Sequence, residues 1–279
     1  MTLPNFLVGG APKAGTTALY NYLRQHPEIC MSDPKETFFF TDEYERGVEW
    51  FSQCFDHCGP EKAIGEASTT TLYEPKAPER VQEVLGAPKF LFVLRDPVER
   101  AYSEYLFFVH KGRIPAKISF ADVVLQKESE YAERILEMGR YEPYLSRFEE
   151  AFGREEMKIL IHQEFRSAPE STLEKVFRFL DVDDTFRPDA LEKHNVTKSP
   201  TSPMVYFWVR RLWHTVRNTV ETQFPEATEG ARRAVRKLLF TEEKPSMSSE
   251  VRKYLTDFYK DETARLEHRL ERPLSEWGT

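Results

Sequence analysis

Residues 8–23 read VGGAPKAGTTALYNYL, an apolar run followed by a turn of small residues and the start of an amphipathic helical pattern. Gly10 and Gly15 have the spacing of the phosphate-binding pattern G-x-x-x-x-G-K-[ST]. Thr16 occupies the position where that pattern has lysine, and the lysine of this turn, Lys13, lies inside the loop. Backbone N–H groups of such a turn and of the helix start that follows it bind phosphate. The stretch therefore predicts a phosphate-binding loop whose cation is displaced toward the strand.

Apolar runs and helical periodicity alternate along the first two thirds of the chain. The short apolar runs predict strands at 5–10, 62–66, 89–94 and 157–162. Helical patterns between and after them predict helices at 16–25, 77–85, 98–110, 143–152 and 169–180. Continuously apolar strands that alternate with helices indicate a parallel sheet covered on both faces. We expect one α/β domain over 1–279, with a central parallel sheet of the P-loop nucleotide-kinase type and a helical C-terminal region.

The composition is that of a globular protein: 40% of the 279 residues are hydrophobic, and the net charge is -7. No stretch approaches the roughly 18 apolar residues that span a bilayer, so an integral membrane protein is not expected. The chain reaches its first strand without a charged leader, which favours a cytoplasmic enzyme or a domain of a longer synthase. The negative net charge argues against nucleic acid as a partner.

Three cysteines, Cys30, Cys54 and Cys58, are too few and too unevenly spaced for a disulfide framework, and a reducing compartment fits them better. The group CFDHC at 54–58 combines two thiols with a histidine. No second ligand pair lies at a spacing typical of zinc sites, so we favour a structural role over a metal site.

Ligands of parallel α/β sheets bind beyond the carboxyl ends of the strands. After the third predicted strand comes Arg95, whose planar charged fork suits a phosphate, and Ser103 follows two helical turns later. The alternative is that Arg95 forms a surface ion pair with Asp96 or Glu99 and that Ser103 is a solvated helix residue.

In the stretch PKETFFF at 34–40, Glu36 is followed after one threonine by a run of three phenylalanines. A carboxylate beside apolar surface is partly desolvated, which suits it to act as a general base. The alternative is the edge of a core strand, with Lys35 and Glu36 both pointing to water.

Five motifs in one order carry a resemblance to a known family: PKAGTT, PKETFFF, GEAS, FVLRDPVERAYSEY and NVTKS. This order resembles the sulfotransferases that use 3′-phosphoadenosine 5′-phosphosulfate (PAPS), particularly the branch of heparan sulfate and bacterial carbohydrate or lipid sulfotransferases. The similarity runs from Asn5 to about Ser199, and the stretch LERPLSEW at 270–277 shows a weaker similarity.

The resemblance implies roles for individual residues. Arg95 and Ser103 would hold the 3′-phosphate of the nucleotide, and Lys198 would help to close over it. Glu36 would be the catalytic base, and Glu66 would lie beside the acceptor. The 5′-phosphosulfate would be held by Pro12, Lys13, Ala14, Gly15, Thr16 and Thr17. Lys13 would neutralise the leaving 5′-phosphate, so that no metal is required.

Two departures from heparan-type members concern the acceptor. Phe38 stands where those members have histidine, and Ala67 stands where they have lysine. Because apolar groups replace two polar ones, the acceptor is expected to be a lipid-like or acyl-carrier-linked hydroxyl rather than a highly anionic polysaccharide. A carbohydrate hydroxyl is an alternative acceptor. His110, beyond Ser103 on the same predicted helix, is a candidate auxiliary acid or base, although such histidines are more often surface helix ends.

The segment 204–240 has more basic than acidic residues, unlike the chain as a whole, and 204–218 within it interleaves aromatic residues with arginines in a helical pattern. We interpret 195–240 as a candidate lid on the acceptor side, suited to an acidic carrier protein or a membrane surface. The alternative is a core-packing helix with a solvated basic face. For the whole chain, the competing functions are a P-loop nucleotide kinase and a non-catalytic nucleotide-binding protein.

Overall fold

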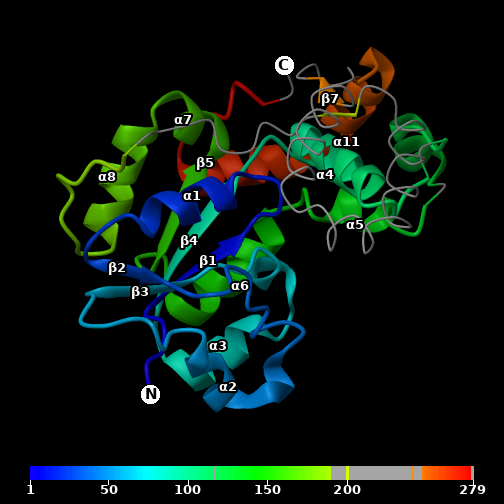
Figure 1. The fold of residues 1–279 in the computed structure, drawn as a ribbon. Helices are drawn as coiled ribbons and strands as arrows, with labels where there is room; N and C mark the ends of the chain where they lie inside the picture. The colour runs from blue at the N-terminus through cyan, green and yellow to red at the C-terminus, as the bar shows by residue number, and fades with distance from the viewer. Residues whose placement is uncertain (116, 128, 190–198, 201–239, 242–246, 278–279) are drawn as a thin grey trace, which may run out of the picture. The chain divides into compact units, whose positions relative to one another are not determined.

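The computed structural model describes residues 1–115, 117–127, 129–189, 199–200, 240–241 and 247–277 (Figure 1). The chain groups into two compact units. The first unit consists of Met1–Arg100, Glu137–His194 and Thr256–Thr279, and the second of Ala101–Leu136 and Asn195–Leu255. Each unit is described by itself below.

A five-stranded parallel sheet in the order β2-β3-β1-β4-β5 forms the centre of the first unit. The strands are β1 (Phe6–Gly10), β2 (Ile29–Met31), β3 (Ala63–Glu66), β4 (Lys89–Leu94) and β5 (Met157–Ile161). The parallel sheet and four of its strands confirm the sequence prediction. β2 was missed because three residues are too short a run to show a period.

Helices cover both faces of this sheet (Figure 1). The α-helices that lie wholly within the unit, among the described residues, are α1 (Thr16–Leu23), α2 (Gly47–Gln53), α3 (Ala77–Leu85), α6 (Glu142–Phe152), α7 (His162–Ser167) and α8 (Pro169–Phe179). Figure 1 shows α1, α7 and α8 on one side of the strands and α3 and α6 on the other. The predicted helices at 16–25, 77–85, 143–152 and 169–180 are thus confirmed to within a few residues at their ends.

Aromatic packing holds α6 against the sheet. Phe90 and Phe92 of β4 place their ring centroids 5.2 and 5.3 Å from that of Phe148 on α6. All three side chains are fully buried. Burying a phenylalanine contributes about 1.5–3 kcal/mol, so this contact is a main reason why the apolar stripe of α6 faces the sheet.

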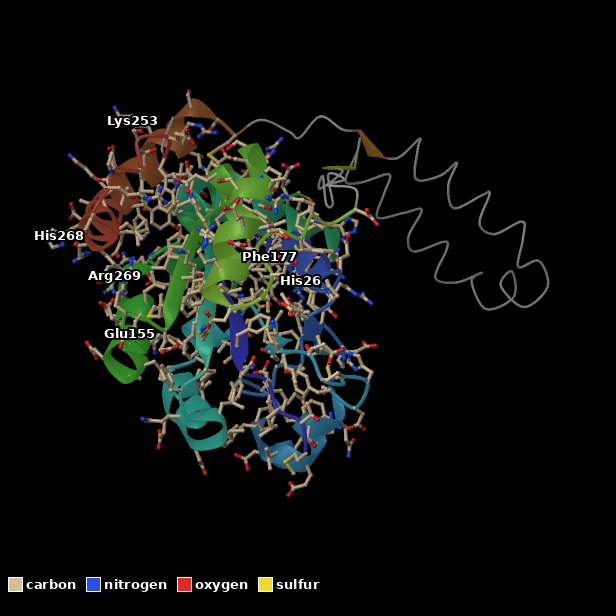
Figure 2. All side chains as sticks on the ribbon, turned by 90° about the vertical axis from the view of Figure 1, so that its left-hand side faces the viewer. His26, Glu155, Phe177, Lys253, His268 and Arg269 are labelled. Carbon is tan, nitrogen blue, oxygen red and sulfur yellow. A yellow bond between two sulfur atoms is a disulfide. The ribbon has the colours of Figure 1, made fainter. Side chains whose placement is uncertain are left out.

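On the opposite face, His26 joins the end of α1 to α8 (Figure 2). Its ring lies 4.6 Å from that of Phe177 and is 2% exposed. Nδ1 of His26 accepts a hydrogen bond from the backbone N–H of Glu28, and Nε2 lies 2.9 Å from the carbonyl oxygen of Asp183. Both ring nitrogens are therefore used for structure, and His26 has no role in the site.

The cysteine expectation needs a correction. Cys30 and Cys58 form a disulfide with their Cα atoms 5.7 Å apart, whereas Cys54 is a buried free thiol. The sequence did not reveal the pair because Cys30 lies on β2, the strand that was missed. The two cysteines of the 54–58 group therefore differ in chemical state, since Cys58 is in the disulfide and Cys54 is not.

The second unit contains most of α4 (Pro97–His110), part of α5 (Ala132–Glu137) and a π-helix at Asp122–Gln126. Tyr102 and Tyr105 of α4 pack against Phe120 with centroid distances of 5.0 and 5.1 Å. Two short antiparallel strands, β6 (Ser199–Pro200) and β7 (Phe240–Thr241), pair with each other, so the C-terminal region contains a short strand pair that was not expected.

α11 (Ser249–Leu270) begins in the second unit and ends in the first. Arg269, near its end, donates to Glu142 at 2.7 Å and also pairs with Glu149, both on α6 (Figure 2). The helical C-terminal region is thereby confirmed for these residues. Among the helices that the structure describes, none is both long enough and apolar enough to cross a membrane.

Candidate functional site

The loop between β1 and α1 lies at the carboxyl edge of the sheet. Gly15 has φ 98°, a left-handed conformation that glycine adopts without strain, and it caps α1. Its carbonyl oxygen accepts the N–H groups of Ala18 and Leu19, which starts the helix. The first N–H groups of the helix have no partner within it and point toward the loop. The local geometry is that of an anion-binding turn.

The loop residues differ in exposure. Ala14 and Thr16 are buried, Pro12 and Lys13 are partly exposed, and Thr17 is exposed. Ala14 donates its N–H to the carbonyl oxygen of Ala11 at 3.3 Å, which closes the turn. The sequence prediction of a strand, a turn and a helix start at this position is confirmed.

Arg95, the first residue after β4, lies against this loop. Its Nη1 donates to the carbonyl oxygen of Lys13 at 3.1 Å, and its Nη2 lies 3.5 Å from Oε2 of Glu99. The side chain is only 12% exposed, and burial lowers the pKa of its guanidinium. The pair with Glu99 is therefore not a solvated surface ion pair, and a buried cation stands beside the loop.

Asp96 begins α4. Its Oδ1 accepts the backbone N–H of Val98 at 2.8 Å and that of Glu99 at 3.4 Å, in the manner of a helix N-cap. The side chain is 2% exposed. One carboxylate oxygen of Asp96 is thus committed to the backbone of the helix.

Glu36 lies in the loop between β2 and α2. Its Oε1 accepts hydrogen bonds from Nζ of Lys35 at 3.1 Å and from Oγ1 of Thr69 at 3.4 Å, and its side chain is 32% exposed. Thr69 also touches β1, because a Cβ built on Gly10 would lie 2.9 Å from the Thr69 carbonyl oxygen. Thr69 therefore joins the Glu36 segment to the strand end from which the loop begins.

A buried carboxylate holds this segment in place. Glu66, at the end of β3, is 1% exposed and accepts hydrogen bonds from the backbone N–H and the hydroxyl of Thr37 at 3.3 and 2.9 Å. It also accepts the N–H of Ser68 at 3.1 Å and the Ser68 hydroxyl. Burial raises the pKa of Glu66, and these four hydrogen bonds act in the opposite direction. Glu66 thus fixes the residue next to Glu36.

Phe38 has an unusual backbone. Its φ is 54°, which is uncommon for a bulky residue and costs of order 1–3 kcal/mol. The conformation is held by four hydrogen bonds: the N–H of Phe38 donates to the Ser68 hydroxyl, and its carbonyl oxygen accepts from the N–H and the hydroxyl of Thr41 and from the N–H of Glu43. Phe38 is partly exposed and lies two residues after Glu36 in the sequence. Ala67, in contrast, is fully buried in the core.

The remaining predicted residues belong to the second unit. Ser103 is buried on α4, and His110 is the last residue of that helix and is partly exposed. Lys198 and the segment 201–239 lie outside the described residues. The structure therefore brings together Lys13, Arg95, Glu36 and Glu66 in the first unit.

One residue at this edge was missed. His162 is the first residue after β5, and a Cβ built on Gly15 would lie 3.1 Å from its Cδ2. His162 was not singled out in the sequence analysis above. Its position directly after a buried strand, as for Arg95, was the signal that would have identified it.

Comparisons with known proteins identify the family of the chain. The model of the family described as "Sulfotransferase domain" matches residues 3–267. A bifunctional heparan sulfate N-deacetylase/N-sulfotransferase 4 of Mus musculus is 28% identical over 294 residues, which cover 99% of this chain and 31% of the relative. The chain thus spans about a third of such relatives. A membrane-associated sulfotransferase of Dictyostelium discoideum is 38% identical over 112 residues, covering 39% of this chain and 24% of that protein.

Solved structures show the same fold. The crystal structure of a sulfotransferase from Alicyclobacillus acidocaldarius aligns over 100% of both chains with a TM-score of 0.74 and 25% identity. A sulfotransferase domain from the curacin biosynthetic pathway aligns over 70% of this chain and 79% of its own, with a TM-score of 0.52 and 15% identity. The second likeness concerns the fold alone.

Proposed function

The chain belongs to the sulfotransferase domain family, and we propose that it transfers a sulfuryl group from PAPS, the donor used by this family, to an acceptor hydroxyl. The observation that carries the proposal is the convergence of the Lys13 loop, Arg95 and Glu36 at the carboxyl edge of one sheet. Thr69 connects Glu36 to β1, the strand that precedes the loop, and Arg95 contacts the Lys13 carbonyl. Such an edge is where ligands of α/β sheets bind.

The residues at the loop fit an anionic group. Gly15 allows a close approach of the ligand to the backbone at the start of α1, and Arg95 adds a buried positive charge against the loop. When bound there, PAPS supplies the sulfuryl group and the 5′-phosphate that leaves. We assign Pro12, Lys13, Ala14, Gly15, Thr16 and Thr17 to the 5′-phosphosulfate.

Lys13 has the central electrostatic role. In phosphoryl transfer by P-loop enzymes, a metal ion neutralises charge that develops between the phosphates. A sulfuryl group carries less charge, and the ammonium group of Lys13 within the loop would stabilise the leaving 5′-phosphate instead. We therefore propose transfer that requires no metal ion.

Glu36 serves as the general base in this proposal. Its carboxylate is partly exposed, as a group that meets an acceptor must be, and Lys35 and Thr69 orient it by hydrogen bonds to one oxygen. The proton of the acceptor hydroxyl passes to the carboxylate as that oxygen attacks sulfur in line with the leaving phosphate. His110 is proposed as an auxiliary acid or base.

Arg95 is assigned to the 3′-phosphate together with Ser103 and Lys198. The largely buried guanidinium of Arg95 attracts an anion more strongly than an exposed guanidinium would, because solvent screens its charge less. The contact of Arg95 with the Lys13 carbonyl gives it a second task, which is to brace the loop.

For the acceptor, we propose a lipid-like, acyl-linked or carbohydrate hydroxyl. Phe38 supports the less charged members of this set, since its partly exposed ring lies two residues from the proposed base. Ala67 adds nothing to that preference because it is fully buried. We propose 195–240 as a lid on the acceptor side, and its basic part, 204–240, as a contact with an acidic carrier protein or a membrane surface.

A nucleotide kinase would need a carboxylate for magnesium near the end of β4. Asp96 comes nearest in the sequence, and one of its oxygens caps α4. This use of Asp96 gives no support to the kinase alternative, and we do not favour it.

The test is transfer of ³⁵S-sulfate from labelled PAPS to a panel of hydroxyl-bearing lipids, acyl thioesters and oligosaccharides. Glu36→Gln should lower the rate by about 10²–10⁴-fold and Lys13→Ala by about 10²–10³-fold, while both still bind the nucleotide. Glu79→Gln, an exposed change on α3, is the matched control and should retain activity. Full turnover by Lys13→Ala would refute its role, and full turnover by Glu36→Gln would remove that residue as the base.

A further inference from the structure

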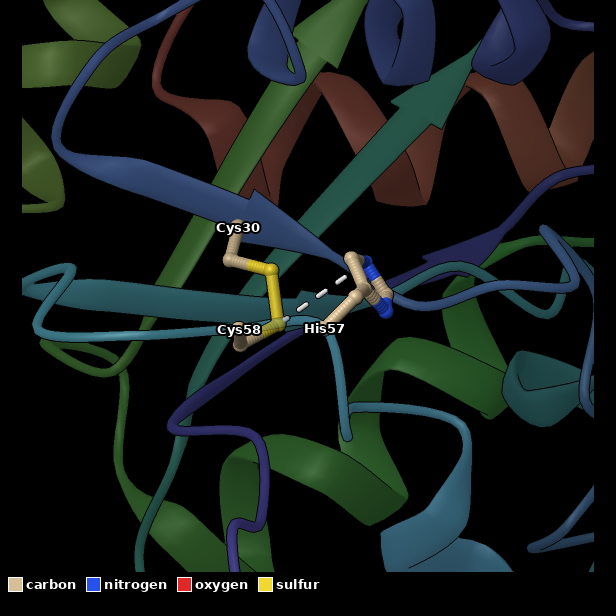
Figure 3. A group of neighbouring side chains, drawn as sticks. All are labelled: Cys30, His57 and Cys58. Atoms are coloured by element: carbon tan, nitrogen blue, oxygen red, sulfur yellow. Dashed lines mark hydrogen bonds between the residues drawn. A yellow bond between two sulfur atoms is a disulfide. The ribbon is translucent and has the colours of Figure 1, made fainter.

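Cys30, His57 and Cys58 form a cluster to which no role was assigned above, and we propose that they form a site for a thiophilic divalent cation such as Zn²⁺ once the disulfide is reduced (Figure 3). Two thiolates and an imidazole are the ligands that such a cation prefers. The proposal concerns a structural site and does not depend on the proposed sulfuryl transfer.

The distances suit a metal ion. The two sulfur atoms and a ring nitrogen of His57 all lie within 4.8 Å of one another, and Nε2 of His57 is 3.9 Å from Sγ of Cys58. Around a tetrahedral zinc ion, neighbouring sulfur and nitrogen ligands are roughly 3.5–3.8 Å apart. Separation of the bonded sulfurs is therefore the main movement required.

The scaffold keeps the three side chains together without the disulfide. Cys30 is the central residue of β2 and pairs with Ile64 of β3. On the other side, Phe51 and Phe55 are fully buried, and the turn from Phe55 to Cys58 is closed by a backbone hydrogen bond of 2.9 Å. Both thiols would therefore stay close to each other after reduction.

His57 completes the set from a position that a metal ion can reach. Its ring is exposed, whereas Cys30 is buried and Cys58 is partly exposed. Nε2 of His57 lies 3.0 Å from the carbonyl oxygen of Met31, which places the ring beside β2 (Figure 3), and a cation bound at Nε2 would replace this contact. Three protein ligands with solvent on one side leave a fourth position for water.

The chemistry balances with a phosphine reductant. The phosphine and one water molecule convert the Cys30–Cys58 disulfide to two thiols and yield the phosphine oxide. Binding of the divalent cation to the two sulfurs then releases two protons, because thiolates are the ligands. In the oxidised protein both sulfurs are engaged with each other, so the same cation has only His57 to bind.

Cobalt(II) tests the site directly, since it reports tetrahedral thiolate coordination by d–d and charge-transfer absorption. The full chain is reduced with the phosphine, freed of excess reagent without air and titrated with Co²⁺, followed by Zn²⁺. We expect a tetrahedral spectrum that saturates at about one equivalent and is displaced by Zn²⁺, and we expect the oxidised protein to show none.

Variants identify the ligands. His57→Asn keeps the disulfide, so its folding can be verified in the oxidised state, and after reduction it should bind Co²⁺ at least about tenfold more weakly. Cys58→Ser should abolish the charge-transfer band, whereas Cys54→Ser, which removes the buried free thiol, should retain it. A reduced wild type without the tetrahedral spectrum, or an unchanged spectrum in His57→Asn or Cys58→Ser, would overturn the proposal.

Discussion

The guanidinium of Arg95 is joined to the carbonyl oxygen of Lys13 by a hydrogen bond of 3.1 Å. This bond links the first residue after β4 to the loop that follows β1, and β1 and β4 are neighbouring strands of the sheet. The guanidinium of Arg95, after β4, thus supports the backbone of the Lys13 loop, after β1. Both the charge at the proposed nucleotide site and the shape of the loop depend on Arg95.

Arg95→Ala should weaken the binding of 3′-phosphoadenosine 5′-phosphate (PAP) by about 10–100-fold, since a charge-assisted hydrogen bond contributes about 1.5–3 kcal/mol. AMP binding should fall less, because AMP lacks the 3′-phosphate but still uses the loop. Titration calorimetry measures both. Arg24→Ala, which removes an exposed arginine just after α1, is the control and should leave both affinities unchanged. Equal losses for the two nucleotides would show that Arg95 only braces the loop.

Gly15→Ala should cost about 1–2 kcal/mol of stability from the left-handed backbone and should also disrupt nucleotide binding. Its new Cβ would lie 3.1 Å from Cδ2 of His162. Gly86→Ala is a matched control, because Gly86 has φ 74° but its Cβ would have nothing within 4 Å. We expect Gly86→Ala to lower the melting temperature without changing PAP affinity. Unchanged PAP affinity in Gly15→Ala would contradict the placement of the phosphate at this loop.

Glu66→Gln should lower the free energy of unfolding by about 1–3 kcal/mol, because the amide presents a donor to the donors of Thr37 and Ser68. It should also reduce turnover through disorder of the Glu36 segment while PAP affinity is kept. Urea unfolding and kinetics measure the two effects. A stability loss without any change in turnover would mean that Glu66 does not position the base.

The same variant has a defined pH dependence. Burial raises the pKa of Glu66 above its ordinary value of 4.5, so the folded protein holds this proton to higher pH than the unfolded chain does. The contribution of Glu66 to stability is therefore greatest below pH 4.5 and declines as the pH rises through the folded pKa. The stability advantage of the wild type over Glu66→Gln should shrink with rising pH, and an advantage that grows would contradict this assignment.

Sequence reasoning identified the features that are local. The apolar run at 89–94 and the Gly10–Gly15 spacing define β4 and the loop by themselves, and both were placed correctly. The contacts of Glu66 with Thr37 and of Cys30 with Cys58 join segments 29 and 28 residues apart, which no period in the sequence reveals. The roles assigned to Glu36, Lys13 and Arg95, as general base, stabiliser of the leaving phosphate and ligand of the 3′-phosphate, are predictions.

The most direct test of the central claim is calorimetric titration of the protein with PAP in the presence of EDTA, with AMP and with ATP plus magnesium in parallel. We predict that PAP binds without metal and at least about tenfold more tightly than AMP, because a charge-assisted contact to the 3′-phosphate is worth about 1.5–3 kcal/mol. ATP with magnesium should bind weakly. Preference for ATP with magnesium, or equal affinity for PAP and AMP, would contradict the assignment of the loop and Arg95 to a PAPS site.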